Sequence, residues 1–300
     1  NKRYYMELSN IISNVMQIPK AKIGNISVLK KGMTNQSFLF SYENEQYILR
    51  IPGVGTEVLI DRKYEAEVYS LLENKGICDH IIYFDADTGY KISKYYRNAY
   101  VCDPQKEDDV KRCMVFLRNF HQKKFYVSHV FDLWERINYY ESLWTEKTIY
   151  ADYEAVKRGV FQLRDYITVD KSEFCLCHID AVPDNFVFAG NNIHLIDWEY
   201  AGMQDPHVDI AMFGIYSFYN REQIDNLIDF YFQGKCSDAV RLKIYCYVAI
   251  CGLLWSNWCE YKRMCGVEFG EYAFRQYQYA KDYLKTVEAE VEKRKIQINE

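Results

Sequence analysis

The chain has 300 residues, of which 49% are hydrophobic and 26% are charged, and its formal net charge is −5. This is the mix of a globular protein of one or two domains, and it argues against disorder. A protein that binds nucleic acid by neutralising phosphates is usually basic, so the acidic balance disfavours that class. There is no secretory signal pattern, and the longest apolar run, around residues 245–255, is shorter than the ~20 residues that span a bilayer. We therefore expect a cytoplasmic protein without membrane insertion.

The ten cysteines suggest neither a metal site nor a disulfide framework. Cys175 and Cys177 are separated by a single residue, and the four cysteines between residues 246 and 265 form no CxxC pair. In a chain of this length without a secretory signal, we expect reduced thiols.

The N-terminal third predicts a small antiparallel sheet. A helix reaches about residue 17, and short apolar or alternating segments separated by turn residues then predict strands. A helical apolar pattern over 56–74, stopped by Gly76, is inserted after the third strand. The predicted strands span residues 25–30, 36–42, 46–51, 81–84 and 90–94.

The rest of the chain predicts mainly helices, interrupted once by strands. Helices are expected at 105–122, 131–144 and 150–165, and again from about residue 205 nearly to the end. The strands between them are expected at 174–178, 186–188 and 193–196. The fold class is therefore α+β, with a small antiparallel β N-lobe over residues 1–95 and a larger, mostly α C-lobe over residues 96–300.

The most informative motif is CHIDAVPDN at residues 177–185, followed by LIDWE at 195–199. Asp180 follows a strand, Asn185 opens the next strand, and Asp197 ends the hairpin. A hairpin returns its second strand beside its first, so we expect Asn185 and Asp197 to approach each other. Carboxylate and amide oxygens suit Mg²⁺ that also binds phosphates, and this is a layout for phosphoryl transfer. The alternative is that these polar residues only cap turns.

A phosphate-binding region is expected further upstream. Gly32 allows close backbone approach in a turn between two strands, and Thr34 and Asn35 offer hydrogen bonds to phosphate oxygens. Arg50, on the third strand, keeps its charge and can bind phosphate bidentately. Glu65 or Glu67 on the following helix could pair with it. The alternatives are an ordinary turn for Gly32 and a surface cation on an edge strand for Arg50.

Together these motifs resemble the choline/ethanolamine kinase family, in its bacterial choline kinase type, within the aminoglycoside-phosphotransferase-like kinase superfamily. The resemblance covers about residues 23–284 and rests on GMTN at 32–35, LR at 49–50, EAE at 65–67, HIDAVPDN and LIDWEYAG. It implies a bilobal protein-kinase-like fold that uses ATP and Mg²⁺.

Carried over by position, the resemblance gives each motif residue a role. Asp180 is the expected catalytic base, and Arg50, paired with Glu65, is expected to contact the ATP phosphates. Asn185 and Asp197 are the expected Mg²⁺ ligands. Further roles follow for the backbone around Ser93 and Tyr95, which would receive adenine, and for Asp209, which would support the catalytic loop.

The expected acceptor is choline, whose quaternary ammonium has no hydrogen to donate and needs aromatic faces. Trp255, Trp258 and Tyr261 are spaced three apart along a helix, and Tyr200 follows the metal-binding motif. The family's choline cage uses aromatic residues at positions matching Tyr200, Trp255 and Trp258. The alternative is ordinary core packing. One departure is Tyr216, which stands near a carboxylate of the eukaryotic members; weaker aromatic candidates are Phe269, Tyr272 and Tyr277.

The expected reaction is ATP-dependent phosphorylation of the choline hydroxyl to give phosphocholine. A kinase of the same fold with another acceptor remains an alternative, and that acceptor would be ethanolamine, an aminoglycoside or another small alcohol. An ATP-binding pseudokinase or scaffold is the non-enzymatic alternative. The amine preference, the number of Mg²⁺ ions and the oligomeric state are left open by the sequence.

Overall fold

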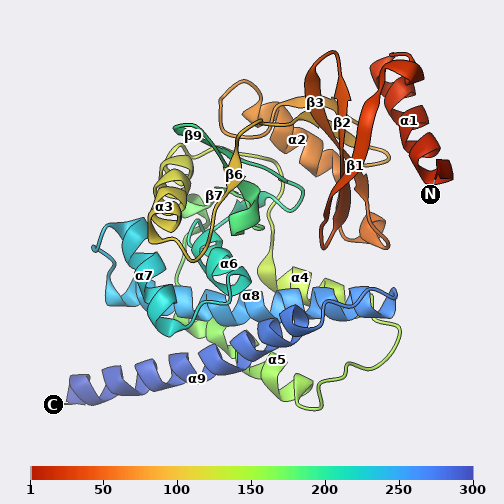
Figure 1. The fold of residues 1–300 in the computed structure, drawn as a ribbon. Coiled ribbons are helices and arrows are strands. Elements are labelled where there is room, and N and C mark those ends of the chain that lie inside the picture. Colours follow the sequence, from red (N-terminus) through yellow and green to blue (C-terminus); the bar gives the residue numbers. More distant parts are fainter. Residues whose placement is uncertain (1, 300) are drawn as a thin grey trace. The chain divides into compact units, whose positions relative to one another are not determined.

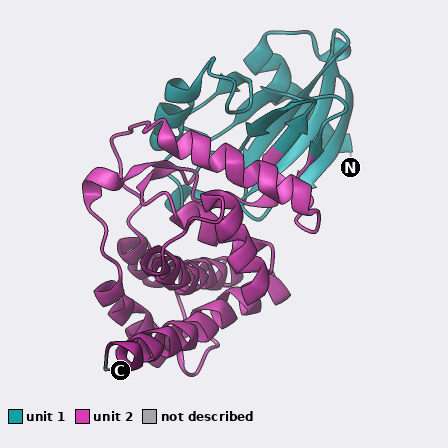
Figure 2. Cartoon of the chain, turned by 90° about the vertical axis from the view of Figure 1, so that its left-hand side faces the viewer, with its two compact units in different colours: residues 1–100, 187–199 teal, residues 101–186, 200–300 magenta. Residues whose placement is uncertain are grey.

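The structure is a computed structural model that describes residues 2–299, and it divides into two units (Figure 2). Unit 1 comprises the chain up to Tyr100 together with Val187–Glu199, and unit 2 comprises Val101–Phe186 together with Tyr200 onward. The sequence gives no sign that a later segment returns to unit 1. Unit 1 therefore carries the whole LIDWE motif, with Asp197 in it.

Unit 1 is built on a five-stranded antiparallel sheet of order β1-β2-β3-β5-β4 (Figure 1). The five predicted strands are all present, with ends that differ by one residue at most. β3 is an interior strand, so Arg50 lies opposite Ser37 on one side and Lys91 on the other. The strands are β1 (Gly24–Lys31), β2 (Asn35–Tyr42), β3 (Glu45–Pro52), β4 (Ile81–Phe84) and β5 (Lys91–Lys94).

The first helix, α1 (Lys2–Met16), covers part of this sheet with an apolar face. Leu8 and Ile12, four residues apart and therefore on one face, are 1% and 0% exposed. They share a core with the sheet residues Phe38, Phe40, Leu49 and Ile92. Burying two such side chains stabilises the unit by roughly 3–6 kcal/mol.

The predicted helix over 56–74 is in fact two elements. A 3-10 turn (Thr56–Val58) comes first, and α2 (Arg62–Leu72) starts afresh after Asp61. The Asp61 side chain accepts a hydrogen bond from the Lys63 amide, and this capping bond explains the break. Glu65 consequently lies in the first turn of α2.

Unit 2 is mainly helical (Figure 1). The three predicted helices before residue 170 are all found and begin two or three residues later than predicted, and the region after residue 205 resolves into four helices. The helices are α3 (Glu107–Gln122), α4 (Leu133–Ser142), α5 (Tyr153–Gln162), α6 (Val208–Tyr216), α7 (Arg221–Phe232), α8 (Asp238–Met264) and α9 (Glu271–Asn299).

The central helix of unit 2 is α8, which packs against α4, α6 and α9. Gly252 lets α9 come close, because a Cβ there would lie 2.7 Å from the Gln276 carbonyl oxygen. Within residues 2–299, α8 is the one helix long and apolar enough to cross a membrane, yet 83% of its apolar window is buried inside the protein. This burial is typical of a core helix.

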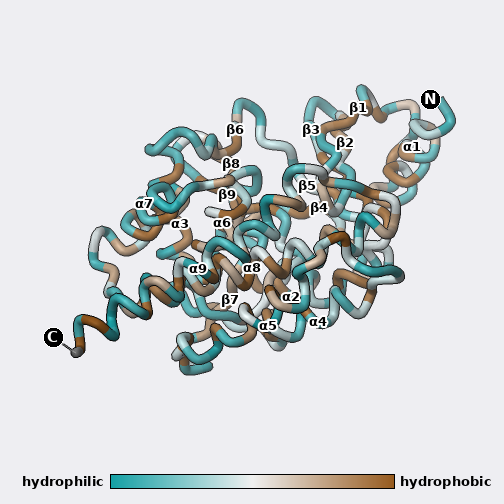
Figure 3. Tube along the Cα trace, turned by 90° about the horizontal axis from the view of Figure 1, so that it is seen from below, coloured by the Kyte–Doolittle hydropathy of each residue, from teal (hydrophilic) through white to brown (hydrophobic). Residues whose placement is uncertain are grey.

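The final turns of α9 carry mostly hydrophilic residues (Figure 3).

Short strands frame the central motif of the sequence. β7 (Cys175–Cys177), β8 (Phe186–Ala189) and β9 (Asn192–Leu195) match the predicted strands, and β8 pairs with β9. Two strands of only two and three residues were not predicted: β6 (Tyr100–Val101) beside β8, and β10 (Gly202–Gln204) antiparallel to β7.

Candidate active site

A buried aspartate of α6 holds the loop that follows β7. Asp209 is 0% exposed, and its two carboxylate oxygens accept hydrogen bonds from the backbone amides of His178, at 3.0 Å, and Ile179, at 2.8 Å. Ile179 has φ +70°, a strained conformation for a β-branched residue. The two bonds offset this strain and fix the residue that precedes Asp180. The supporting role expected for Asp209 is confirmed.

Two residues that the sequence analysis missed orient Asp209 in turn. His121 Nε2 lies 2.8 Å from Asp209 Oδ2, and its Nδ1 lies 2.8 Å from the Tyr231 hydroxyl. A carboxylate oxygen accepts, so His121 Nε2 donates to Asp209, while Nδ1 shares a hydrogen bond with the Tyr231 hydroxyl. His121, Cys177 and Asp209 are close enough to hold a metal ion. However, both Asp209 oxygens and both His121 nitrogens already have protein partners, so this cluster serves the loop.

Asp180 and Asn185 meet within this loop. The Asn185 side-chain nitrogen donates to the Asp180 backbone carbonyl at 2.8 Å, and that carbonyl also accepts from the Val182 amide at 2.8 Å. Asn185 is 3% exposed, whereas the Asp180 side chain is half-buried. Since the amide nitrogen is committed to the loop, the amide oxygen of Asn185 is the atom that can serve a cation. Unit 2 thus presents a carboxylate and a hard amide oxygen from one short turn.

Asp197 lies two residues after the end of β9 in unit 1, beside a buried lysine that the sequence analysis also missed. Its Oδ1 is 3.4 Å from Nζ of Lys91, which lies 2.9 Å from both Asp79 Oδ2 and the Tyr69 hydroxyl oxygen. Burial lowers the pKa of Lys91 and Asp79 raises it; the net shift is upward, so the ammonium stays charged. The Asp197 side chain keeps 34% exposure, and its carboxylate remains accessible to a cation.

Arg50 is paired with Glu65, one of the two partners that the sequence left open. Arg50 Nη1 and Nη2 lie 2.5 and 3.0 Å from the two Glu65 oxygens, and Nη2 also donates to the Gly89 carbonyl at 2.9 Å. Arg50 is 2% exposed on an interior strand, so its interpretation as a surface cation on an edge strand is wrong. Its expected contact with ATP phosphates stays a prediction.

A second arginine, absent from the predicted site, extends this network. Arg62 Nη1 lies 2.9 Å from both Glu65 Oε1 and Glu199 Oε2. Asn35 donates to both Glu199 oxygens, at 2.8 and 2.9 Å. Glu199 belongs to the LIDWE motif, so this motif is tied through its glutamate to the turn between β1 and β2. Two buried arginines and two buried glutamates balance one another here.

The other residues expected near the nucleotide have structural partners within unit 1. A Cβ on Gly32 would approach the Asn35 carbonyl oxygen to 3.1 Å, so the turn favours glycine. The Thr34 carbonyl accepts from the Gly53 amide at 2.9 Å. Ser93 is buried in β5, and the Tyr95 amide donates to the Gln46 carbonyl at 3.0 Å. Because the Tyr95 amide is already bonded, an adenine bound near residues 93–95 would have to form its hydrogen bonds with other groups.

The aromatic residues predicted for a cation cage come together in unit 2. Trp258 Nε1 donates to the Tyr200 hydroxyl at 2.9 Å, and the ring centroids of Tyr200 and Trp255 lie 5.3 Å apart at 80°. Trp255 and Trp258 meet edge to face at 6.2 Å, and Phe269 stacks on Trp258 at 5.3 Å. We call Tyr200, Trp255, Trp258 and Phe269 the aromatic cluster.

The remaining aromatic candidates differ in position. Tyr261 is half-buried one turn further along α8. Tyr272 packs against Tyr216 at 5.7 Å. Tyr277 stacks on Tyr150 at 3.8 Å and donates to Asp152, so its ring and hydroxyl are engaged elsewhere in unit 2.

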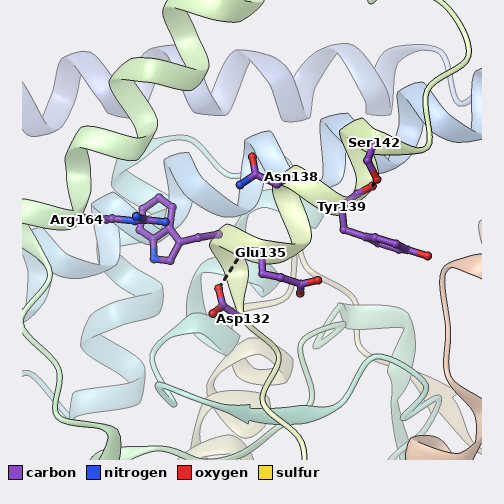
Figure 4. A pocket seen from close by; sticks show the side chains of 7 residues that line it. Asp132, Glu135, Asn138, Tyr139, Ser142 and Arg164 are labelled. Carbon is purple, nitrogen blue, oxygen red and sulfur yellow. Dashed lines mark hydrogen bonds between the residues drawn. The ribbon is translucent and has the colours of Figure 1, made fainter.

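Unit 2 also contains a hollow of about 540 Å³ at the start of α4 (Figure 4). Its polar groups serve local structure: Asp132 accepts from the Glu135 amide at 3.0 Å, and the Arg164 guanidinium lies 4.5 Å from the Trp134 ring centre. These groups cap a helix and cover an indole face.

Comparison with known proteins shows both the class and the family. The fold is protein-kinase-like, as expected: a LicA choline kinase from Streptococcus pneumoniae superposes with a TM-score of 0.83 at 31% identity, covering 95% of this chain and 99% of that one. Spectinomycin phosphotransferase shares the fold alone, with a TM-score of 0.56 at 14% identity over 95% of this chain and 98% of that one. The model of the choline/ethanolamine kinase family matches residues 26–228, and the chain belongs to this family.

Two further relatives span most of the chain. Protein LicA of Haemophilus influenzae is 28% identical over 279 residues, which cover 86% of this chain and 78% of that protein. A LicA protein solved in complex with AMP has a TM-score of 0.80 at 31% identity, covering 94% of this chain and 98% of that one.

Proposed function

We propose that this protein transfers the γ-phosphoryl group of ATP to the hydroxyl of choline, giving ADP and phosphocholine in the cytoplasm. The observation that carries the choline assignment is the aromatic cluster, in which Tyr200, Trp255 and Trp258 are in mutual contact. A trimethylammonium group donates no hydrogen bond, so aromatic faces are the groups that recognise it. Family membership supports the phosphotransferase chemistry.

In this proposal Asp180 orients the choline hydroxyl and accepts its proton. The alcohol oxygen attacks the γ-phosphorus in line, the bond from that phosphorus to the β–γ bridging oxygen breaks, and ADP leaves. Arg50, in unit 1, offsets the negative charge of the ATP phosphates. Most of the rate enhancement then comes from positioning and electrostatics.

The residues proposed to hold Mg²⁺ fit that ion by their chemistry. The amide oxygen of Asn185 is left for a cation because its nitrogen is bonded to the Asp180 carbonyl, and Asp197 offers a carboxylate. Both are hard oxygen ligands of the kind Mg²⁺ takes beside phosphates. When bound, the ion neutralises negative charge on the phosphates.

A kinetic panel distinguishes choline from the acceptors that other kinases of this fold could use. ADP release is measured with choline, ethanolamine and a kanamycin-type aminoglycoside, and we expect the highest kcat/KM with choline. An aminoglycoside needs clustered carboxylates for several ammonium groups, whereas the aromatic cluster offers rings. Turnover of the aminoglycoside without turnover of choline would overturn the proposal, and so would the absence of any alcohol-dependent ADP release, which a pseudokinase predicts.

A change in the aromatic cluster is expected to weaken choline binding. Trp258→Leu removes the ring that contacts Tyr200, Trp255 and Phe269, and a cation–π contact contributes about 0.5–2 kcal/mol. The KM for choline should therefore rise roughly 2- to 30-fold, with the KM for ATP little changed. Trp134→Leu, in the separate hollow at α4, is the matched control and should leave both values unchanged. An equal rise in both variants would indicate a general loss of structure.

A further inference from the structure

A carboxylate lies next to the tyrosine that departs from the eukaryotic pattern. The Tyr216 hydroxyl donates to Asp184 Oδ2 at 3.4 Å, joining the C-terminal end of α6 to the 3-10 turn Pro183–Asn185. The sequence analysis took Tyr216 as the loss of an acidic group. The structure instead brings a different acidic residue to the same tyrosine.

This pair is continuous with the aromatic side of unit 2. The Tyr216 and Tyr272 rings pack at 5.7 Å and 60°. Burial raises the pKa of Tyr216, and the nearby charges of Asp184 and Asp180 raise it further. Burial also raises the pKa of Tyr272, with Asp180 and Tyr200 among the groups acting on it. Tyr216 therefore contacts the Asp184 carboxylate with its hydroxyl and the Tyr272 ring with its own ring.

The charge balance makes a second carboxylate useful here. Lys262 is 1% exposed, and its ammonium lies 5.6 Å from the Trp258 ring centre, so the aromatic cluster already faces one cation. A second cation near the same rings is repelled by a first one, and a nearby carboxylate opposes that repulsion. Asp180 is reserved for the hydroxyl proton in the proposed reaction. The ammonium of the acceptor is two carbons away from that hydroxyl and needs a carboxylate of its own.

We propose that Asp184, held by the Tyr216 hydroxyl, is the specificity-determining carboxylate that attracts the ammonium group of the acceptor alcohol. This inference rests on the proposed function and deepens it, because it names the charged group that selects amino alcohols over neutral ones. Aromatic rings supply the contact surface, and Asp184 supplies the charge preference.

The test compares choline with 3,3-dimethylbutan-1-ol, in which a carbon replaces the ammonium nitrogen. In Asp184→Asn we expect the ratio of kcat/KM for choline to that for the neutral alcohol to fall by about tenfold, because only choline loses an attraction. Tyr216→Phe should lower the same ratio by a smaller factor, since the carboxylate remains but is no longer held. Asp165→Asn, at an exposed site of unit 2, is the matched control and should keep the wild-type ratio.

The outcomes separate this inference from the proposed function. An unchanged ratio in Asp184→Asn, or equal losses with both alcohols, would overturn the role of Asp184. Equal losses with an altered Mg²⁺ requirement would assign Asp184 to the metal site next to Asn185, which also overturns it. If Asp184→Asn fails to fold, an unchanged ratio in Tyr216→Phe overturns the inference by itself. A wild-type protein that phosphorylates neither choline nor ethanolamine would instead refute the proposed function.

Discussion

Asp180→Asn is expected to lower kcat for choline-dependent ADP release by about 10²- to 10⁴-fold, the usual contribution of a positioned general base. The amide keeps the size of the side chain but cannot accept the hydroxyl proton. The loop should keep its geometry, because Asn185 and Val182 bind the backbone carbonyl of Asp180. Coupled ADP-release kinetics measure the effect, and thermal unfolding tests whether the variant is folded.

The expected pattern is specific to the chemical step. Binding of ATP should be unchanged in Asp180→Asn, and Asp165→Asn should behave as wild type in every assay. Wild-type turnover in a folded Asp180→Asn variant would show that another group accepts the proton. A comparable loss in Asp165→Asn would show that the assay responds to a general change in charge.

The regular elements could be predicted from the sequence because their apolar periods are clear. Alternating or apolar runs bounded by turn residues placed the five strands of unit 1 almost to the residue. The failures have local causes. β6 and β10 are too short for a periodic pattern, and the predicted helix over 56–74 breaks because Asp61 offers a capping bond that competes with its continuation.

The site was predictable only where spacing along the chain carries the information. Asp180 and Asn185 are five residues apart in one turn, and Trp255 and Trp258 are three apart on one helix, so local geometry alone brings each pair together. Arg62 and Lys91 were missed because charged residues on an amphipathic helix or a strand usually face solvent. Only the tertiary fold, which supplies Glu199, Asp79 and Asp197 as partners, reveals that both are buried.

The buried network around Glu65 leads to the second large effect. Glu65→Gln removes the nearer charged partner of Arg50, whose other carboxylate, Glu199, lies 3.9 Å away, and it leaves Arg62 with Glu199 alone. Breaking a buried ion pair on one side costs about 3–5 kcal/mol. The melting temperature should fall by roughly 10 °C for a protein of this size. Differential scanning calorimetry at neutral pH measures the loss. Glu57→Gln, at an exposed position of the 3-10 turn that precedes α2, is the matched control and should shift stability by about 0.5 kcal/mol or less.

The double variant Arg50→Met with Glu65→Leu discriminates between a lost charge balance and a lost shape. It removes one cation and one anion together, and the Arg62–Glu199 pair at 2.9 Å remains balanced. Stability should therefore recover most of the loss, because apolar replacements of a buried pair are often neutral. A double variant less stable than Glu65→Gln would show that packing around the guanidinium, and not charge, holds unit 1 together.

Acid should diminish the difference between wild type and Glu65→Gln. Burial raises the pKa of Glu65, but the charge and hydrogen bonds of Arg50 outweigh it and hold the pKa below the ordinary value of 4.5. A carboxyl whose folded pKa is depressed contributes stability above its unfolded pKa and loses it as the pH falls through the folded value. The free energies of unfolding of wild type and Glu65→Gln should therefore differ fully at neutral pH and begin to converge below about pH 4.5. A difference that persisted unchanged at still lower pH would mean that it does not come from the ionised carboxylate.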